Sequence, residues 1–144
     1  MSESIENANV SPTAAATILL VDDNPLVLAA YRGALARRGY QVETAADGLE
    51  AMRKVASIRP ALVVLDLLMP KIDGAYVLKF IRSQSQIKKV PVIVLSDATI
   101  ADAAKTALDQ HPDAVFLKSQ CTATLLADKI AELLGRAGSG TPAA

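Results

Sequence analysis

The apolar run Leu62–Leu65, which leads directly into Asp66, constrains the fold more than any other stretch of the chain. Its four residues show no polar alternation, and such a run is typical of a strand buried on both faces, as in a parallel sheet. A carboxylate at the end of a buried strand is either structural or functional. The residues that reach the same edge of the sheet decide between these alternatives.

Five apolar runs have the character of strands, and a helical segment follows each of them. The predicted strands are Ile18–Val21, Val42–Ala45, Ala61–Leu65, Val92–Leu95 and Ala114–Leu117. Strand and helix therefore alternate along the chain, which favours an α/β fold: a doubly wound (βα)5 sandwich around a five-stranded parallel sheet, with right-handed connections.

Residues typical of helix starts and stops divide the helical segments from the strands. We expect the first helix to end at Gly39 and the last near Leu134. The residues that mark the five helix starts are Pro25, Asp47, Gly74, Thr99 and Thr122. The aromatic residues assigned to packing are Tyr31, Tyr40, Tyr76 and Phe80.

Length and composition indicate one compact domain. The chain has 144 residues, of which 51% are hydrophobic and 21% are charged. We expect a flexible leader at 1–16, a folded domain at 17–135 and a flexible tail at 136–144. The net charge of zero gives no electrostatic footprint for nucleic acid or an anionic membrane. Partners are therefore expected to be proteins.

A single cysteine, Cys121, excludes an internal disulfide and a multi-cysteine metal site. This is compatible with a reducing cytosol. The N-terminal segment has no positively charged start, and the apolar run after it is too short for a signal peptide. The expected location is the cytoplasm.

The expected functional site lies where the strands end. In an open α/β sheet, ligands bind beyond the carboxyl ends of the strands. The residues there that carry chemistry are Asp22, Asp23, Asp66, Ser96 and Lys118. Three crowded carboxylates repel one another unless a hard divalent cation lies between them, and Mg²⁺ suits such oxygens. Zinc is disfavoured, since the one histidine, His111, is in a predicted loop.

A phosphoryl group fits the same set of side chains. Carboxylates form aspartyl phosphates, so Asp66 can act as the nucleophile. The Lys118 ammonium and the metal would neutralise charge on the transferring group, and the Ser96 hydroxyl offers a hydrogen bond.

Four segments, "ILLVDDNP", "VVLDLLMPKIDG", "PVIVLS" and "VFLKS", resemble the receiver domain of bacterial two-component response regulators. The resemblance covers essentially all of 17–134 and implies a flavodoxin-like strand order, 2-1-3-4-5. It implies Asp23 as a direct metal ligand, Asp22 as a ligand largely through water, an oxygen from Asp66, and the backbone carbonyl of Leu68.

The resemblance also implies the partners. A sensor histidine kinase or a histidine phosphotransfer protein would donate the phosphoryl group to Asp66, with Ser96 and Lys118 assisting. The chain would then be an Mg²⁺-dependent phosphoacceptor rather than a turnover enzyme. The surface of the last two helices and the last strand, about 99–134, would change conformation and signal to a protein target, and a phosphorylation-dependent dimer is possible.

The sequence departs from the family pattern around the site. Ser119 follows the lysine in place of a proline, and Val115 occupies the position of the usual switch aromatic, with Phe116 one place later on the opposite face. An extra acid, Asp97, follows Ser96 and most simply caps the next helix. Leu68 and Ala98 occupy positions that often orient the hydrolytic water with polar side chains, so we predict slow autodephosphorylation.

Several alternatives stay open from the residues alone. Asp22 and Asp23 could cap the first helix together with Asn24, and Asp66 could be a structural acid paired with Lys118. The chain could be a receiver fragment of a larger regulator or hybrid kinase, or a phosphorylation-independent interaction module. A stand-alone receiver is favoured because the chain ends soon after the last helix.

A haloacid dehalogenase type of enzyme would also phosphorylate an aspartate at a strand end. That class needs a second acid two residues after the nucleophile, where this chain has Leu68. This enzyme class is therefore disfavoured.

Overall fold

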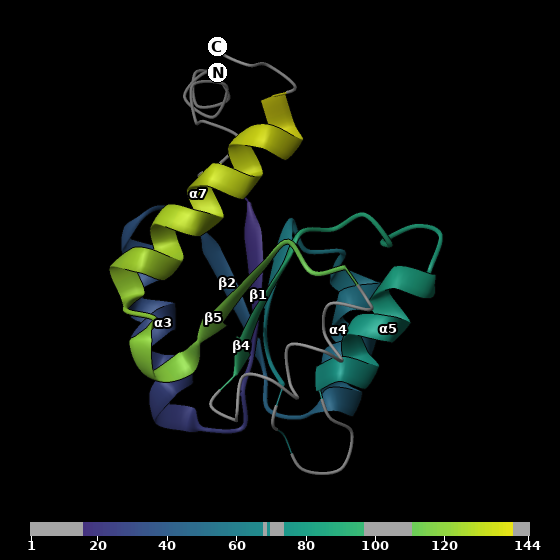
Figure 1. Cartoon of the computed structure of the whole chain (residues 1–144), viewed down its shortest axis with the longest axis horizontal. Helices are drawn as coiled ribbons and strands as arrows, with labels where there is room; N and C mark the ends of the chain where they lie inside the picture. Colours follow the sequence, from purple (N-terminus) through teal and green to yellow (C-terminus); the bar gives the residue numbers. More distant parts are fainter. Residues whose placement is uncertain (1–15, 68, 70–73, 97–110, 140–144) are drawn as a thin grey trace, which may run out of the picture.

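The computed structural model describes residues 16–67, 69, 74–96 and 111–139 (Figure 1). Of the predicted leader, only Ala16 lies within these residues, and the predicted fourth helix lies outside them. So do Leu68, Asp97 and Ala98.

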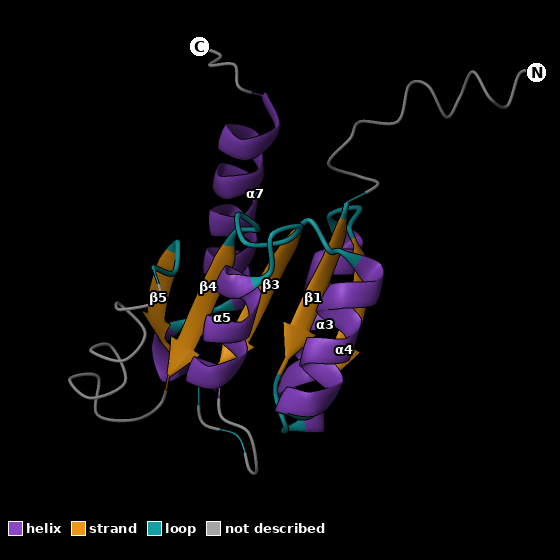
Figure 2. Cartoon of the chain, turned by 90° about the vertical axis from the view of Figure 1, so that its right-hand side faces the viewer, coloured by secondary structure: helices purple, strands orange, loops and turns teal. Residues whose placement is uncertain are grey.

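A five-stranded parallel sheet forms the centre of the molecule. Its strands are β1 (Thr17–Val21), β2 (Gln41–Ala45), β3 (Leu62–Asp66), β4 (Val92–Ser96) and β5 (Ala114–Leu117). The order across the sheet is β2-β1-β3-β4-β5, and each neighbouring pair is parallel. The predicted fold class and strand order are confirmed. All strands point to one edge, which we call the carboxyl edge (Figure 2).

Burial follows each strand's place in the sheet. The residues of β3 and β4 are all buried, as are those of β1 after Thr17. The two outer strands, β2 and β5, are only partly covered. The apolar run that ends at Asp66 is therefore the middle strand of a sheet covered on both faces, as its lack of polar alternation predicts.

Helices cover both faces of the sheet. They are α3 (Pro25–Arg37), α4 (Gly48–Ile58), α5 (Gly74–Ser83) and α7 (Ala123–Ser139). The views in Figures 1 and 2 place α4 and α5 on one face and α3 and α7 on the other. A short 3-10 helix, η1 (Lys118–Gln120), joins β5 to the last helix. None of the described helices is both long and apolar enough to cross a membrane.

Capping residues fix where the first two helices begin. Asn24 accepts hydrogen bonds from the backbone N–H groups of Leu26 and Val27, and Pro25 occupies the first turn. Asp47 accepts from the N–H of Glu50, whose carboxylate accepts in return from the N–H of Ala46. The predicted caps of these helices thus have direct partners.

The ends of the first and last helices differ from expectation. Helix α3 ends at Arg37, and Gly39 follows with a φ of 96°, a conformation that favours glycine. Helix α7 continues to Ser139, past the end predicted near Leu134 and into the predicted tail. A single glycine costs a helix only about 1 kcal/mol, and Gly135 lies in open space where nothing forces the chain to turn.

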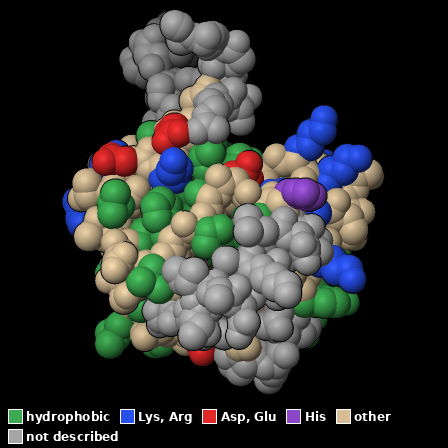
Figure 3. Space-filling model, in the orientation of Figure 1, with side chains coloured by type: hydrophobic (Ala, Val, Ile, Leu, Met, Phe, Trp, Pro, Cys, Tyr) green, Lys and Arg blue, Asp and Glu red, His purple; other side chains and the backbone are tan. Residues whose placement is uncertain are grey.

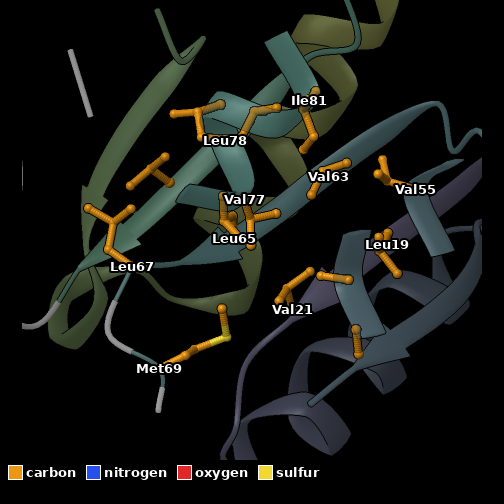
Figure 4. Packing of buried hydrophobic residues seen from close by; sticks show 14 of the residues in the cluster. Leu19, Val21, Val55, Val63, Leu65, Leu67, Met69, Val77, Leu78 and Ile81 are labelled. Carbon is orange, nitrogen blue, oxygen red and sulfur yellow. The ribbon is translucent and has the colours of Figure 1, made fainter. Parts of the chain in front are cut away.

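Two hydrophobic clusters lie on opposite faces of the sheet. The first packs α4 and α5 against the sheet through residues such as Val55, Val77 and Ile81 (Figure 4). The second packs α3 and α7 through Leu35 and Ile130. Each cluster excludes water from one face, so the strands between them are held rigidly.

Alternate residues of β5 contribute to different clusters. Val115 packs against the first and Phe116 against the second, as strand periodicity predicts. Tyr31 and Tyr40 join the second cluster and Phe80 the first, as expected. The assignment of Tyr76 to packing is wrong: its side chain is 56% exposed, because it lies on the outer side of α5.

Candidate functional site

Two adjacent acids follow β1 and have different surroundings. Asp22 is buried and its backbone N–H donates to the Ala45 carbonyl, whereas Asp23 is exposed. One oxygen of Asp22, Oδ1, accepts from the N–H of Asn24 at 2.8 Å. Asn24 itself is the N-cap of α3. Neither acid is therefore the capping residue, although Asp22 supports the turn that carries the cap.

Asp66 is the last residue of β3 and is 2% exposed. The next residue, Leu67, donates its N–H to Leu95 of β4 and accepts from the N–H of Gly74 at 3.0 Å. A Cβ on Gly74 would lie 2.3 Å from the Asp66 carbonyl oxygen. Helix α5 therefore begins against the backbone of Asp66, and only glycine fits there.

This close approach goes beyond the sequence interpretation, which treated Gly74 only as a helix start. The Asp–Gly pair at the end of "VVLDLLMPKIDG" is the one signal for it in the sequence. Asp73, which precedes Gly74 in the sequence, lies outside the described residues.

Lys118 directly follows β5, an outer strand of the sheet, and its side chain reaches the acids. Its ammonium lies 2.6 Å from Asp22 Oδ2 and donates a hydrogen bond to Asp66 Oδ2 at 3.1 Å. Burial lowers the pKa of this ammonium, but the adjacent carboxylates of Asp22 and Asp66 outweigh burial, and the pKa is raised. Lys118 is thus held charged. The expected structural partner was Asp66 alone; the contact with Asp22 is an addition.

Ser96 completes the described part of the edge. It is the last residue of β4, is 1% exposed, and lies opposite Leu117 in the register with β5. Asp66 pairs with Leu95 on the neighbouring strand, so Ser96 stands one residue further along the same edge. Ser119, the residue in place of a proline, lies within η1.

Carboxylate oxygens of Asp22, Asp23 and Asp66 lie within 4.8 Å of one another. Lys118 is the cation beside them in the described part of the chain, so three carboxylates share one ammonium. The buried oxygen Asp22 Oδ2 accepts no hydrogen bond from the described residues and faces the Lys118 ammonium as an ion pair. This oxygen-only donor set, with excess negative charge, fits a hard divalent cation such as Mg²⁺.

The backbone carbonyl of Leu68, predicted to be a further ligand, lies outside the described residues. His111, with its backbone in the left-handed region, follows no strand end at this edge, and Cys121 is buried in the second cluster. Neither residue belongs to the acidic group that the described residues form.

Comparison with known proteins identifies the family. A family model, "Response regulator receiver domain", matches residues 18–130. The chain is 38% identical over 122 residues to the transcriptional regulatory protein PrrA of Mycobacterium tuberculosis. This alignment covers 85% of this chain and 51% of PrrA. It is 34% identical to a gliding motility regulatory protein of Myxococcus xanthus over 81% of this chain, but only 15% of that protein.

Solved structures of receiver proteins are similar to this chain in fold. The signal receiver domain of a histidine kinase from Syntrophus aciditrophicus has a TM-score of 0.80 at 29% identity, covering 90% of this chain and 97% of that one. The chemotaxis protein CheY4 of Vibrio cholerae has a TM-score of 0.76 at 29% identity, covering 82% and 98%.

The chain spans about half the length of PrrA. The family model matches residues 18–130 of this chain. Because that model covers most of the sequence and the fold and relatives agree with it, the chain belongs to the receiver domains of two-component response regulators.

Proposed function

We propose that the chain accepts a phosphoryl group on Asp66 from a histidine kinase or a histidine phosphotransfer protein. The observation that carries this proposal is the arrangement of one buried carboxylate, Asp66, beside two further acids and a charged lysine at the end of a rigid strand. A carboxylate used only as a structural partner of Lys118 would not need Asp22 and Asp23 beside it.

The reaction needs a nucleophile, a leaving group and compensation of charge. An oxygen of Asp66 would bond to phosphorus as the bond from phosphorus to the donor's imidazole nitrogen breaks, leaving an acyl phosphate on the chain. Bound Mg²⁺, held by Asp22, Asp23 and Asp66, would supply positive charge beside the transferring group. Since the chain itself ends the step modified, it is a phosphoacceptor rather than a turnover enzyme.

Lys118 and Ser96 would act on the phosphoryl oxygens. The ammonium is already 3.1 Å from Asp66 Oδ2, and its raised pKa keeps it charged at physiological pH. The Ser96 side chain projects from the neighbouring strand end and can donate to a phosphoryl oxygen. A shift of Ser96 toward the phosphate would transmit the modification to the surface of residues 99–134, which includes β5 and most of α7.

Exposed apolar side chains near the site support a protein as the donor. Leu26 is 79% exposed and Leu125 is 47% exposed, in the first turns of α3 and α7. Figure 3 shows hydrophobic side chains on the surface over these two helices. Leu49 and Tyr76 lie in the first turns of α4 and α5 and are also exposed. Since all four helices begin at the carboxyl edge, these residues surround the site.

Two alternatives are compatible with the family. The chain could be the receiver part of a larger regulator, and the partial coverage of PrrA and of the gliding motility protein supports this alternative. It could also be an interaction module that works without phosphorylation. The single buried cysteine supports a cytoplasmic location for each.

The experiment is intact-mass spectrometry after incubation with Mg²⁺ and acetyl phosphate. We expect one phosphoryl adduct on the wild type and none on Asp66→Asn. The decay of the adduct after donor removal measures autodephosphorylation of Asp66. We predict that it is slow, because Leu68 and Ala98 have no polar side chain to orient the hydrolytic water. Absence of an adduct with both acetyl phosphate and a panel of histidine kinases would reject the phosphoacceptor function and leave the interaction module.

A further inference from the structure

A surface hollow of about 280 Å³ lies between the end of α4 and the turn that follows α5. These segments lead into the starts of β3 and β4, so the hollow is at the edge of the sheet opposite to the acidic cluster. Its volume is close to the lower end of the range of about 300–1,000 Å³ that small-molecule sites occupy. The residues that line it are Ala56, Arg59, Gln84, Ser85, Gln86 and Ile87.

The polar side chains of this hollow are rich in hydrogen-bond donors. Arg59 supplies a guanidinium, Ser85 a hydroxyl, and the two glutamines supply carboxamide N–H groups. No acid is among the described residues that line the hollow. Arg59 donates through Nη2 to Gln86 Oε1 and forms no ion pair with another described residue. The positive charge of Arg59 is therefore not neutralised within the described part of the chain.

The backbone of Arg59 directs its side chain. Arg59 ends α4 with a φ of 53° and a ψ of 64°, a left-handed conformation that favours glycine, and its N–H donates to the Val55 carbonyl. A glycine here would end the helix with less strain but would supply no cation. The arginine thus places a guanidinium at the hollow from a position where helix termination alone favours glycine.

The turn after α5 is held in place before any ligand binds. Backbone N–H groups donate from Gln84 to Ile81, from Ile87 to Gln84 and from Val90 to Ile87. The Ile87 side chain is 8% exposed and packs in the first hydrophobic cluster. A ligand of the hollow would therefore order few groups on binding, which reduces the entropic cost.

Further cations flank the hollow. Lys88 and Lys89 directly follow Ile87, are exposed, and pair with no acid among the described residues. Figure 3 shows Lys and Arg side chains gathered at the upper right of the molecule, where Figure 1 places the turn after α5. Such a concentration of positive charge attracts anions toward the donors of the hollow.

We propose that the hollow binds the phosphate group of a small phosphorylated ligand. Arg59 would donate two parallel hydrogen bonds to the phosphate, and the hydroxyl and carboxamides of the turn would complete the contacts. A phosphate monoester has three terminal oxygens and nearly two negative charges, so it uses more of these donors than a carboxylate does. This inference goes beyond the proposed function and does not depend on it, since it uses none of the acidic cluster.

The test is a titration of the ¹⁵N-labelled whole chain with ribose 5-phosphate, followed by NMR at constant ionic strength and without divalent cations. Ribose is the uncharged control. We expect saturable shifts of the backbone amides of residues 84–89 and of the side-chain N–H groups of Arg59 and Gln86, with no response to ribose. The amides of Asp22 and Asp66, at the other edge of the sheet, should stay in place.

Two variants test the contact with the guanidinium. Arg59→Gly removes the side chain but suits the left-handed backbone, so the variant should fold, and we expect about tenfold weaker binding of ribose 5-phosphate. Arg32→Gln removes the same charge from an exposed position on α3, which packs on the other face of the sheet. Its affinity should stay within about twofold of the wild type, because salt screens distant charges.

Several outcomes would overturn the proposal. One is the absence of shifts at residues 84–89 throughout the millimolar range of ribose 5-phosphate, in the wild type, which needs no variant to fold. Equal losses in Arg59→Gly and Arg32→Gln would assign the binding to net charge. Shifts caused by a phosphoserine peptide but not by ribose 5-phosphate would assign the hollow to a protein partner instead of a small ligand.

Discussion

The two edges of the sheet, where the strands begin and where they end, differ in how their charged side chains are paired. At the edge where the strands begin, which we call the amino edge, Arg82 of α5 donates to the carbonyls of His111, Lys88 and Val90 and to the carboxylate of Asp113. At the carboxyl edge, three carboxylates share one ammonium. The first arrangement pairs one cation with one anion and several neutral acceptors, whereas the second leaves negative charge in excess.

The two edges therefore differ in how completely these charged groups are paired. Asp113 also accepts from the N–H of Val92. Through Arg82 and Asp113, hydrogen bonds and an ion pair connect α5 with the starts of β4 and β5. The carboxyl edge instead brings three carboxylates beside one ammonium, so its negative charge is in excess. The same core thus carries paired charges around Arg82 at one edge and unpaired charge around Asp66 at the other.

The largest expected effect is at the carboxyl edge, for Gly74→Ala. The added Cβ would lie 2.3 Å from the Asp66 carbonyl oxygen and 2.7 Å from Leu67 Cα, so the backbone must shift. We expect the free energy of unfolding, measured with urea, to fall by about 3 kcal/mol. Gly135→Ala is the control: a Cβ there meets nothing within 4 Å, and the variant should gain up to about 1 kcal/mol. Equal stability of the two variants would contradict the close approach of Gly74 to the Asp66 backbone.

A smaller effect is expected at the amino edge, for Arg82→Met. Loss of the hydrogen bonds to three carbonyls and Asp113 should lower the free energy of unfolding by about 2 kcal/mol. Calorimetric Mg²⁺ affinity should stay within about twofold of the wild type, because these partners of Arg82 lie at the edge opposite to the acidic cluster.

The matched variant at the other edge is Asp23→Asn. The exposed Asp23 makes no ion pair with the described residues, so stability should change by less than about 0.5 kcal/mol. Its Mg²⁺ affinity should fall about tenfold or more, because one carboxylate of the cluster is lost. If Arg82→Met weakened Mg²⁺ binding as much as Asp23→Asn, the two edges would not be independent.

The smallest effect concerns Glu50, at the start of α4. Its hydrogen bond with the N–H of Ala46, and then the nearby Lys54 ammonium, lower its pKa against the opposing effect of burial. A lowered pKa means that the carboxylate stabilises the fold above its unfolded pKa of about 4.3, and that this contribution is lost as pH falls through the folded value. Glu50→Gln should therefore lose about 0.5 kcal/mol at pH 7 and approach the wild type at pH 3. A pH-independent difference would show that the charge of Glu50 is not responsible.

Much of the fold follows from short-range patterns. The strands at β1, β3 and β4 were predictable because a short, continuous apolar run between turn residues is typical of a buried strand, and the caps at Asp47 and Thr122 depend on neighbours within a few residues. The end of α7 was not predictable from Gly135, because one glycine does not decide where a helix stops. The exposure of Tyr76 depends on which side of α5 faces the sheet.

The candidate site was predictable by position but not by contact. Asp22, Asp23, Asp66, Ser96 and Lys118 were expected at one edge because they follow strand ends in a parallel sheet. The approach of Gly74 to the Asp66 backbone, and the choice of Asp22 as the closer partner of Lys118, depend on the placement of segments that are far apart in the sequence.

The sequence by itself determined the alternation of strands and helices, the family, and the set of polar side chains at the carboxyl edge. Only the tertiary structure decided how these side chains share their charges. Hydrophobic periodicity and capping act over a few residues and can be read along the chain, whereas electrostatic energy depends on distances between side chains brought together from different strands. The 2.6 Å contact between Lys118 and Asp22 joins residues that are far apart in the sequence, and no local pattern specifies it.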